Sequence, residues 1–395
     1  MSPAVRHGAM RAGNLAAVLG ELDRRGPLTR AALAEFTGLT KTTVSKLVAY
    51  LIDAGMAVES GTVRDGERGR PGVVVRLSGH RVAALGLEIN VDYLAGCVVD
   101  LSRTVRLLRT QPVDNRAATP EDVIARLREL ASALLVDAGE LGLSVAGGMV
   151  ALPGPVDRAT GAVHRAPNLG WRDVAVTETL DLPLPVVVDN EANLAALGEL
   201  WFGSGASLGD FLHVSGEIGI GAGLVVQGEL FRGAHGFAGE LGHVVVSPEG
   251  PACRCGGSGC LERYAGQDAL LAPGEDLAGL VARLRGGDAA AAAACERAGS
   301  ALGVALTSAV NLIDPDTIVL GGIFAPLYGW VSAPAGRAMR ERLGQMRRRV
   351  PTLVVSRVGA DAATLGGAGQ VIQRIIADPG AHLVMLDATP SSPAR

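Results

Sequence analysis

One histidine and three cysteines are spaced like a set of metal ligands. His243 is followed by Cys253, Cys255 and Cys260, and the stretch between the first and last cysteine holds the glycines that a tight chelating loop needs. Three thiolates and one imidazole make a closed tetrahedral zinc set with no open position for water. We therefore predict a structural Zn²⁺ site in a loop over 243–262. In the alternative, the histidine and three buried thiols are unrelated.

Polar side chains border this cluster. Glu240 precedes His243 by three residues and Glu262 follows the last cysteine by two, while Asn190 and Glu191 follow a predicted strand over 184–188. The carboxyl end of such a strand is where α/β sheets bind ligands. Carboxylates, an amide and an imidazole suit a ligand rich in hydroxyls, such as a sugar. Each residue alone has a simpler explanation: Glu240 as surface, Asn190 as a helix cap and Glu262 as a first-turn helix acid.

The elements that position these residues lie between residues 81 and 378. Three alternating strands over 82–89, 93–101 and 104–110 open this body, and strands over 211–214 and 221–226 begin a second set in the same way. A duplicated, two-lobed α/β body is the economical interpretation. The pattern also predicts strands over 143–152, 317–320 and 352–355, and helices over 120–138, 192–202, 276–285, 289–312, 333–349 and 362–377. The proline-rich tail, 379–395, is predicted to be disordered.

The first 80 residues differ from the body in charge. They carry eleven lysines and arginines against seven acidic residues, whereas the whole chain has a net charge of -4. The only two lysines, Lys41 and Lys46, lie in this head. A basic head on an acidic body indicates a polyanionic partner, because phosphate neutralisation dominates nucleic-acid affinity. Chance is the alternative on charge alone.

Three predicted helices and a hairpin make the head resemble a winged helix-turn-helix. Helices are expected over 14–25, 30–36 and 41–54, with Thr29 and Thr40 as N-caps and Gly38 in the turn, and a hairpin joins strands over 56–60 and 72–77. The third helix would offer its first turns to the major groove and the wing loop its arginines to the minor groove. An ordinary three-helix core with a solvated loop is the alternative. The candidate DNA-binding residues are Arg30, Thr40, Lys41, Thr42, Thr43, Ser45, Lys46, Arg64, Arg68 and Arg70.

Composition narrows the class of protein. A chain of 395 residues has room for two or three domains. Charged residues interrupt every apolar run before the roughly 18 residues of a membrane span, and no signal peptide is visible, so we expect a cytoplasmic protein. Five cysteines cannot form a disulfide framework in a chain of this length.

Taken together, these motifs resemble the ROK family (repressor, open reading frame, kinase), whose members are sugar kinases and related transcriptional regulators. The matching segments are 167–171, 189–193, 219–223, 239–243 and the loop 253–262. The resemblance implies an actin-like ATPase fold for the body. It also implies that Asn168, Asn190, Glu191, Glu240, His243 and Glu262 hold a sugar, with His243 serving zinc and sugar through its two ring nitrogens. A winged helix in front is typical of the family's regulators and absent from its plain kinases.

The chain departs from the kinase pattern at three points. Family kinases carry an Asp-x-Gly-Gly-Thr phosphate loop, but this chain reads Glu88 to Asp92 without a glycine, so backbone amides cannot approach a phosphate. Glu217 replaces a small hydroxyl residue of the second phosphate loop, and Glu191 stands where kinases have a catalytic Asp. A longer base misplaces the proton acceptor by about an ångström, which can cost roughly 100-fold in rate. We therefore predict no catalytic residues and no enzyme activity.

The sequence thus predicts a sugar-responsive transcriptional regulator, most simply a repressor of carbohydrate uptake or catabolism genes. Its expected partners are double-stranded operator DNA, a sugar or sugar phosphate, and a second copy of the chain in a homodimer or tetramer. One alternative is an active ATP-dependent, glucokinase-like sugar kinase with an appended DNA-binding domain. Another is an oligomerisation or docking module without a ligand, against which the shared presence of Asn190, Glu240, His243 and Glu262 counts.

Overall fold

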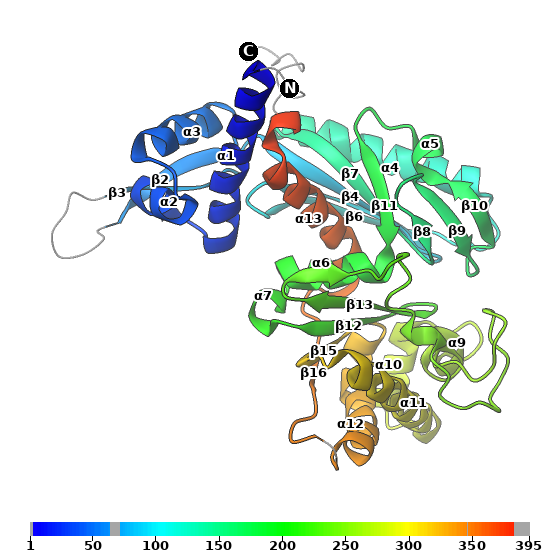
Figure 1. Cartoon of the computed structure of the whole chain (residues 1–395). Coiled ribbons are helices and arrows are strands. Elements are labelled where there is room, and N and C mark those ends of the chain that lie inside the picture. Colours follow the sequence, from blue (N-terminus) through cyan, green and yellow to red (C-terminus); the bar gives the residue numbers. More distant parts are fainter. Residues whose placement is uncertain (1–2, 64–71, 346, 383–395) are drawn as a thin grey trace.

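The computed structural model describes residues 3–63, 72–345 and 347–382. In Figure 1 the molecule consists of a small head and a body of two lobes stacked one above the other. Residues 78–81 connect the last strand of the head to the first strand of the body. Within the described residues, no helix combines the length and the apolar character that a membrane crossing requires.

The head contains three helices and a three-stranded sheet. Its elements are α1 (Pro3–Arg25), β1 (Leu28–Thr29), α2 (Arg30–Thr37), α3 (Lys41–Asp53), β2 (Ala57–Val63) and β3 (Gly72–Leu77), with strand order β1-β3-β2. Thr29 and Thr40 cap α2 and α3 as predicted, and Gly38 ends α2 in the left-handed conformation. One face of α3 is buried through Val44, Leu47, Val48 and Leu51. This packing leaves the opposite face of α3 in solvent.

The two lobes repeat one sheet topology. In the first lobe, β4 (Val82–Ile89) pairs antiparallel with β5 (Tyr93–Asp100), followed by β6 (Val105–Pro112), and parallel with β7 (Ser144–Leu152), followed by β11 (Val186–Asn190). In the second, β12 (Phe211–Gly216) has the same relations to β13 (Ile220–Val226) and β14 (Glu229–Phe231) on one side and to β15 (Thr317–Gly322) and β16 (Thr352–Val355) on the other. The predicted duplication is therefore confirmed.

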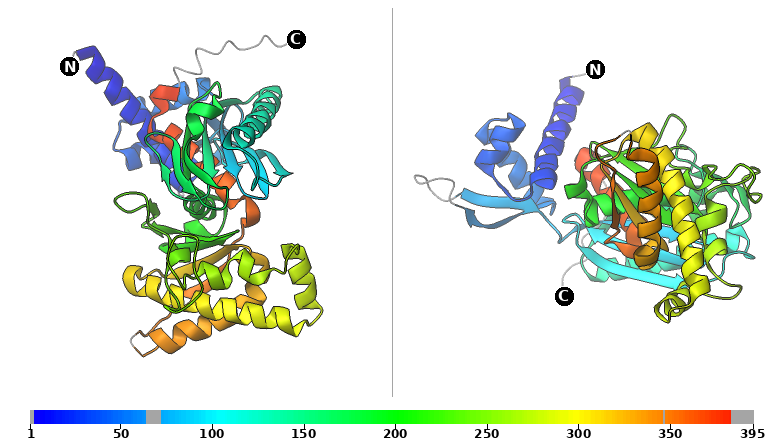
Figure 2. Two further views of the ribbon diagram at one scale, coloured as in Figure 1. Left: turned by 90° about the vertical axis from the view of Figure 1, so that its right-hand side faces the viewer. Right: turned by 90° about the horizontal axis from the view of Figure 1, so that it is seen from below.

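Helices cover the sheets of both lobes. In the first lobe, α4 (Pro120–Glu140) packs against β5, and a small sheet of β8 (Val156–Asp157), β9 (Ala162–Ala166) and β10 (Trp171–Ala175) leads into α5 (Val176–Leu180). In the second lobe, α11 (Ala289–Ile313) and α12 (Phe324–Leu343) pack against each other below the sheet (Figure 2). The other short helices are α7 (Gly205–Leu208), α8 (Glu262–Ala265), α9 (Gln267–Leu270) and α10 (Leu277–Arg285).

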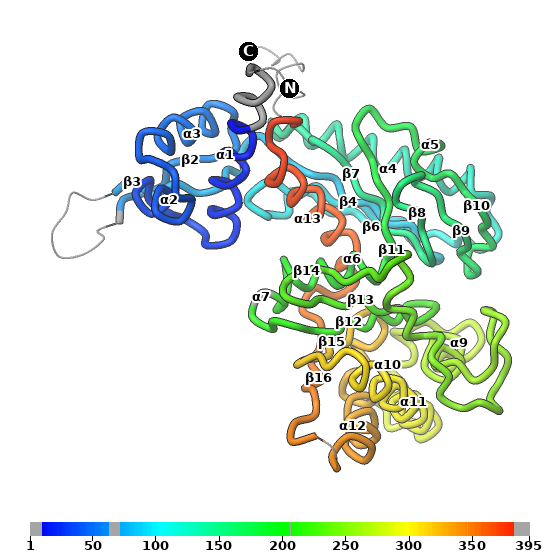
Figure 3. Tube along the Cα trace, viewed as in Figure 1, coloured from blue at the N-terminus to red at the C-terminus, as the bar shows by residue number. Residues whose placement is uncertain are grey.

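Two helices between the lobes pack closely. The chain trace in Figure 3 shows α13 (Ala362–Ala377) returning to the sheet of the first lobe, next to α6 (Glu191–Phe202). A Cβ on Gly198 would collide with the carbonyl of Ala362, and one on Gly366 with the carbonyl of Leu194. Glycine at these two positions therefore lets the helices approach backbone to backbone. A single buried apolar cluster continues from this pair into the head, through residues such as Leu19 and Ile376.

Three sequence predictions need correction. The helix predicted over 333–349 is α12, which begins at Phe324 and ends at Leu343. Pro334 is typical of a first helical turn but lies buried inside α12, where it faces Gly299 of α11. The small β8-β9-β10 sheet was not predicted, because its strands are too short to show alternation. In the tail, residues 379–382 form a helical turn, and 383–395 lie outside the described residues.

Candidate functional site

The His243 cluster has the geometry of a metal site. One ring nitrogen of His243 and the three cysteine sulfurs all lie within 4.8 Å of one another. Cys255 Sγ is 3.7 Å from Cys260 Sγ, and Cys253 Sγ is 3.8 Å from His243 Nδ1. A Zn–S bond of about 2.3 Å places two thiolates of a tetrahedron roughly 3.8 Å apart, so these separations fit a zinc ion. The short helix η1 (Leu241–His243) and the backbone bond from Leu261 N to Val244 O hold the two ends of the loop together.

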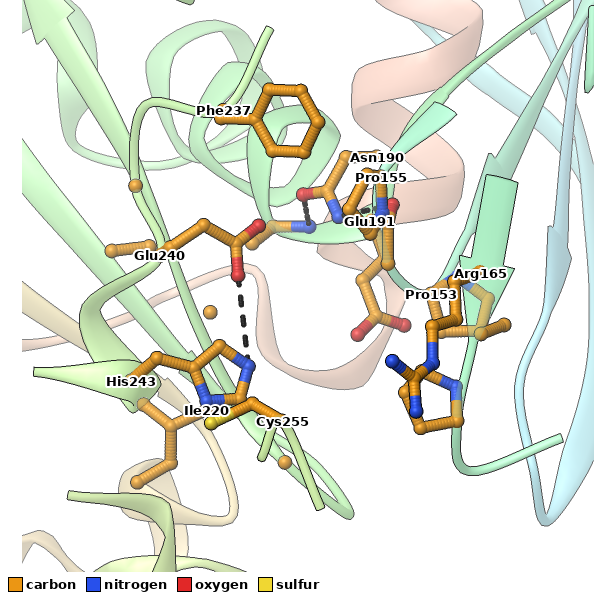
Figure 4. A pocket seen from close by; sticks show the side chains of 18 of the residues that line it. Pro153, Pro155, Arg165, Asn190, Glu191, Ile220, Phe237, Glu240, His243 and Cys255 are labelled. Carbon is orange, nitrogen blue, oxygen red and sulfur yellow. Dashed lines mark hydrogen bonds and ion pairs between the residues drawn. The ribbon is translucent and has the colours of Figure 1, made fainter. Parts of the chain in front are cut away.

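A cavity of about 360 Å³, called here the main cavity, lies beside this loop between the two lobes. The other ring nitrogen of His243, Nε2, faces it and lies 3.8 Å from Glu240 Oε2. Figure 4 shows the Glu191 carboxylate entering the same space between Glu240 and the guanidinium of Arg165. All six residues predicted for the sugar line this cavity: Asn168, Asn190, Glu191, Glu240, His243 and Glu262.

Three of these side chains are already fixed by the protein. The Asn190 carbonyl oxygen caps α6 by accepting from the Ala192 and Asn193 amides, while its Nδ2 donates to the carbonyl of Gly154 at 3.0 Å. Glu262 starts α8 and accepts from the Ile220 amide at 3.3 Å. Asn190 therefore caps a helix and Glu262 is a first-turn helix acid, as the simpler explanations predicted, and both residues also line the main cavity. Asn168 accepts from Arg254 Nη1 at 2.9 Å, which ties the first lobe to the metal loop.

A second, much smaller space adjoins Glu191. This carboxylate cavity, of about 10 Å³, is lined by Glu88, Glu191 and Glu217 together with the buried His213. Glu88 is 2% exposed and accepts hydrogen bonds from Tyr93 and Thr364, each at 2.8 Å. The volume of the carboxylate cavity is about what a single water molecule needs. The space is thus filled by carboxylates rather than open to an anion.

Burial changes the titration of this group. Desolvation, followed by the charges of Glu88 and Glu240, raises the pKa of Glu191 to about 8. Burial raises the pKa of Glu88 and of Glu217 as well. Burial lowers the pKa of His213 to about 4, and neither of its ring nitrogens has a hydrogen-bond partner in the described part of the chain. A negatively charged ligand next to Glu191 would add to this repulsion.

The candidate DNA-binding residues divide into three groups. Lys41, Thr42, Ser45 and Lys46 are exposed on the free face of α3. Thr40 and Thr43 share a hydroxyl–hydroxyl bond of 2.9 Å, and Arg30 forms an ion pair of 2.7 Å with Glu59 of β2, so these three already have partners in the head. Arg64, Arg68 and Arg70 fall outside the described residues.

Several residues of the main cavity were not predicted. Arg165 and Arg254 contribute positive charge, and Phe237 places an aromatic ring at the wall (Figure 4). Arg165 lies on β9, which the sequence pattern did not reveal. Phe237 stands among glycines in the segment 233–239, and that isolated aromatic in a glycine-rich stretch was the available signal.

Comparison with known proteins shows which family the chain belongs to. The model of the ROK family matches residues 84–374, and a MarR family model matches residues 16–68 of the head. The chain belongs to the ROK family. It is 29% identical over 372 residues to the xylose repressor of Bacillus subtilis, covering 91% of this chain and 94% of the repressor. The similarity therefore extends through both head and body.

Solved structures give the same division. The crystal structure of a ROK family transcriptional regulator, a homologue of the Escherichia coli MLC protein, matches with a TM-score of 0.78 and 26% identity over 95% of this chain and 98% of that one. A ROK family glucokinase from Streptomyces griseus, in complex with glucose and AMPPNP, matches with a TM-score of 0.63 and 27% identity over 73% of this chain and 98% of that one. The predicted fold is confirmed: an actin-like, sugar-kinase-like body behind a winged helix.

Proposed function

We propose that this protein is a sugar-responsive transcriptional repressor whose body binds a sugar in the main cavity and whose head binds operator DNA. The observation that carries the proposal is the joining of two parts in one chain. Six hydrogen-bonding side chains converge on a cavity of about 360 Å³, and the basic face of α3 is exposed on the attached head. Similarity to a xylose repressor along 94% of its length supports the same assignment.

In this proposal, hydrogen bonds between cavity side chains and the hydroxyl groups of the sugar hold the ligand. The carboxylates of Glu191, Glu240 and Glu262 accept from sugar hydroxyls, and His243 Nε2 adds a contact from the metal loop. Zn²⁺ bound by His243 Nδ1 and the three thiolates fixes the imidazole, because a ligating ring nitrogen sets the orientation of the other. Zinc therefore has a structural role and positions His243 and Glu262 at the cavity.

The carboxylate cavity argues against the kinase alternative. Glu88 and Glu217 replace the residues expected in the two phosphate loops, and the space between them is about 10 Å³. The volume does not suit a triphosphate, and the three carboxyl groups offer it no positive charge. We therefore propose a sensor without phosphoryl-transfer activity. The kinase alternative still needs a direct test, because a glucokinase from S. griseus matches 73% of this chain.

Operator binding is proposed to involve a homodimer. Two heads related by a twofold axis would meet two half-sites of a palindrome, each through Lys41, Thr42, Ser45 and Lys46. Sugar binding between the lobes would change operator affinity only if the sugar favours one arrangement of the heads over the other.

The first test is thermal unfolding of the zinc-loaded protein with a panel of sugars and sugar phosphates, each with and without Mg-ATP. A ligand that binds only the folded state raises the unfolding midpoint. We expect one sugar to raise it, no further rise with ATP, and no response in Glu240→Ala. An ATP-dependent shift or consumption of the sugar would restore the kinase alternative, and a full response in Glu240→Ala would reject the main cavity as the site.

A further inference from the structure

A third space, called here the side cavity, opens next to the main cavity. It has a volume of about 320 Å³ and lies between the strands β8 and β9 and the loop after β14. The two cavities share three wall residues, Pro155, Gly236 and Phe237. They therefore adjoin each other, and together they offer roughly twice the space of the main cavity.

Phe237 stands at the junction of the two cavities. Its side chain is 55% exposed, and Figure 4 shows the ring above the main cavity, near Pro155 and Asn190. At the junction of two cavities, the exposed ring offers a flat apolar surface that a ligand in either cavity can cover. The apolar C–H face of a sugar ring is a suitable cover, because an aromatic face and a polarised C–H bond attract each other.

The loop that carries Phe237 is held in place. The Ala238 amide donates to the Arg232 carbonyl at 3.1 Å, which closes the loop, and Arg232 forms an ion pair of 2.9 Å with Asp189 at the end of β11. Asp189 precedes Asn190, so the loop is anchored to the strand that forms the floor of the main cavity. Gly233, Gly236 and Gly239 have positive φ angles of 72°, 81° and 98°, which other residues rarely adopt. Phe237 is thus positioned by the fold rather than left on a free loop.

The walls of the side cavity have the polar chemistry that a second sugar ring needs. His164 on β9 and His235 on the loop both line it, and Asp157 and Arg158 add an acceptor and a donor, although Arg158 also forms an ion pair of 3.4 Å with Asp189. His164 and His235 are exposed, so both imidazoles are accessible to a ligand. A mixture of donors, acceptors and one aromatic ring matches a neutral polyol better than an ionic or purely apolar ligand.

We propose that the effector is a disaccharide, with one ring in the main cavity and the second in the side cavity, on either side of Phe237. This inference rests on the proposed sugar-sensing function and names the class of sugar. His164 and His235 then contact only the second ring, while Phe237 contacts both. Discrimination between a disaccharide and its monosaccharide unit arises from the side cavity alone.

The test is calorimetric titration of the zinc-loaded full chain with matched pairs: xylose and xylobiose, glucose and cellobiose, glucose and maltose, N-acetylglucosamine and chitobiose. We expect one disaccharide to bind at least about 10-fold more tightly than its unit. In His164→Ala/His235→Ala the advantage falls to roughly 2-fold or less while the affinity for the monosaccharide is unchanged. Phe237→Ala weakens both members of the pair by roughly 3- to 10-fold, in line with the loss of one ring-stacking contact.

Phe231→Ala is the matched control. Phe231 is 53% exposed and lies six positions before Phe237, but it lines neither cavity, so its removal should change neither affinity. If a monosaccharide binds and no disaccharide binds more tightly, the disaccharide proposal is wrong and the sugar-sensing function stands. If the double histidine variant still binds the disaccharide more tightly than the monosaccharide, the side cavity does not hold the second ring. If no sugar of the panel binds, both the proposed sugar-sensing function and the disaccharide proposal are wrong.

Discussion

Asp23, near the end of α1 in the head, accepts hydrogen bonds from Arg103 in the turn between β5 and β6 of the body. The Nη2 atom of Arg103 lies 3.0 Å from Oδ1 and 3.1 Å from Oδ2 of Asp23, and Gln373 of α13 donates to Oδ2 at 2.7 Å. The Arg103 guanidinium also lies 5.2 Å from the ring of Trp201 at the end of α6. The head is therefore attached directly to α13 and, through Arg103, to α6, the two helices that run between the lobes.

Asp23→Asn should weaken this attachment. The side chains of Asp23 and Arg103 are only 16% and 17% exposed, and the variant places a neutral amide group against the partly buried guanidinium of Arg103. A lost charged hydrogen-bond network of this kind costs about 1–3 kcal/mol of unfolding free energy. Urea unfolding followed by circular dichroism measures it. Asp53→Asn, at an exposed position on α3, serves as the control and should change stability by less than about 0.5 kcal/mol. If Asp23→Asn and Asp53→Asn lower the unfolding free energy equally, the contact between Asp23 and Arg103 does not stabilise the protein.

The same variant should uncouple sugar from DNA. The first residue of α6, Glu191, lines the main cavity, and Trp201 in its last turn contacts Arg103. Arg103 in turn pairs with Asp23, so a shift of α6 on sugar binding would reach the head at Asp23. We expect Asp23→Asn to keep its affinity for a DNA fragment selected in vitro by the parent protein, and to lose most of the change in that affinity on adding sugar. Fluorescence anisotropy of labelled DNA measures both quantities. An undiminished sugar response in Asp23→Asn would rule this contact out as the link.

Stability should fall as the pH rises, because of the carboxylate cavity. Glu191 has a pKa of about 8 in the folded protein against 4.5 for an ordinary glutamate, so the folded state binds its proton more tightly than the unfolded state. Its contribution to stability is complete below pH 4.5 and is lost as the pH rises through 8. Glu88 and Glu217 shift in the same direction. The charged and titratable groups around Glu191 include Glu88, Tyr93, Arg165, His213, Glu217 and Glu240, and the wall of the main cavity adds His243, Arg254 and Glu262.

Glu191→Gln tests this pH dependence. We expect the parent protein to lose about 2 kcal/mol of stability through Glu191 between pH 6 and 8, since one pKa unit corresponds to about 1.4 kcal/mol. The Gln variant should have a flatter profile and exceed the parent in stability at pH 8. His213, whose pKa falls from 6.5 to about 4, acts in the opposite direction as the pH rises through this range, and it does so equally in the parent protein and in the Gln variant. Unfolding midpoints from pH 6 to 8.5 provide the measurement, and parallel profiles for the two proteins would contradict the assignment.

Local patterns predicted the head and the metal loop well. The caps Thr29 and Thr40, the buried face of α3 and the antiparallel pairing of the wing strands all follow from short-range rules, because each depends on residues a few positions apart. The His243 cluster was predictable for a similar reason, since its ligands span fewer than twenty residues and their donor chemistry is specific.

Long-range contacts were beyond the sequence pattern. Nothing in the spacing of Asp23 and Arg103 indicates that they meet, and Arg165 and Phe237 reach the main cavity from segments whose local patterns show no regular element. Thr364 donates to Glu88 across most of the chain, and only the folded structure brings them together. Asn190 shows the opposite case, because one side chain serves both as the helix cap that local rules predict and as part of the cavity wall.

Zinc removal should disorder the wall of the main cavity. Cys255→Ser removes one of the four proposed ligands from a loop that carries His243 and leads into Glu262, so both side chains should lose their positions. We expect less than one zinc per chain by elemental analysis, a lower unfolding midpoint, and loss of sugar binding. Cys295→Ala, at a buried cysteine of α11 outside the cluster, should also lower the midpoint but keep full zinc occupancy. Sugar affinity that survives in zinc-free Cys255→Ser would show that the metal does not support the cavity.

Lys46→Ala should weaken DNA binding through the loss of a phosphate contact. Lys46 is exposed on the free face of α3, opposite the buried Leu47 and Val48, so its removal leaves the packing of the head intact. We expect affinity to fall by a similar factor for the selected fragment and for unrelated DNA, and the slope of log affinity against log salt to decrease in magnitude by about one. Arg337→Ala is the charge-matched control, since Arg337 is also exposed and belongs to α12, which lies at the end of the second lobe away from the head (Figure 1). A salt slope unchanged in Lys46→Ala, or reduced as much in Arg337→Ala, would place the DNA on another surface.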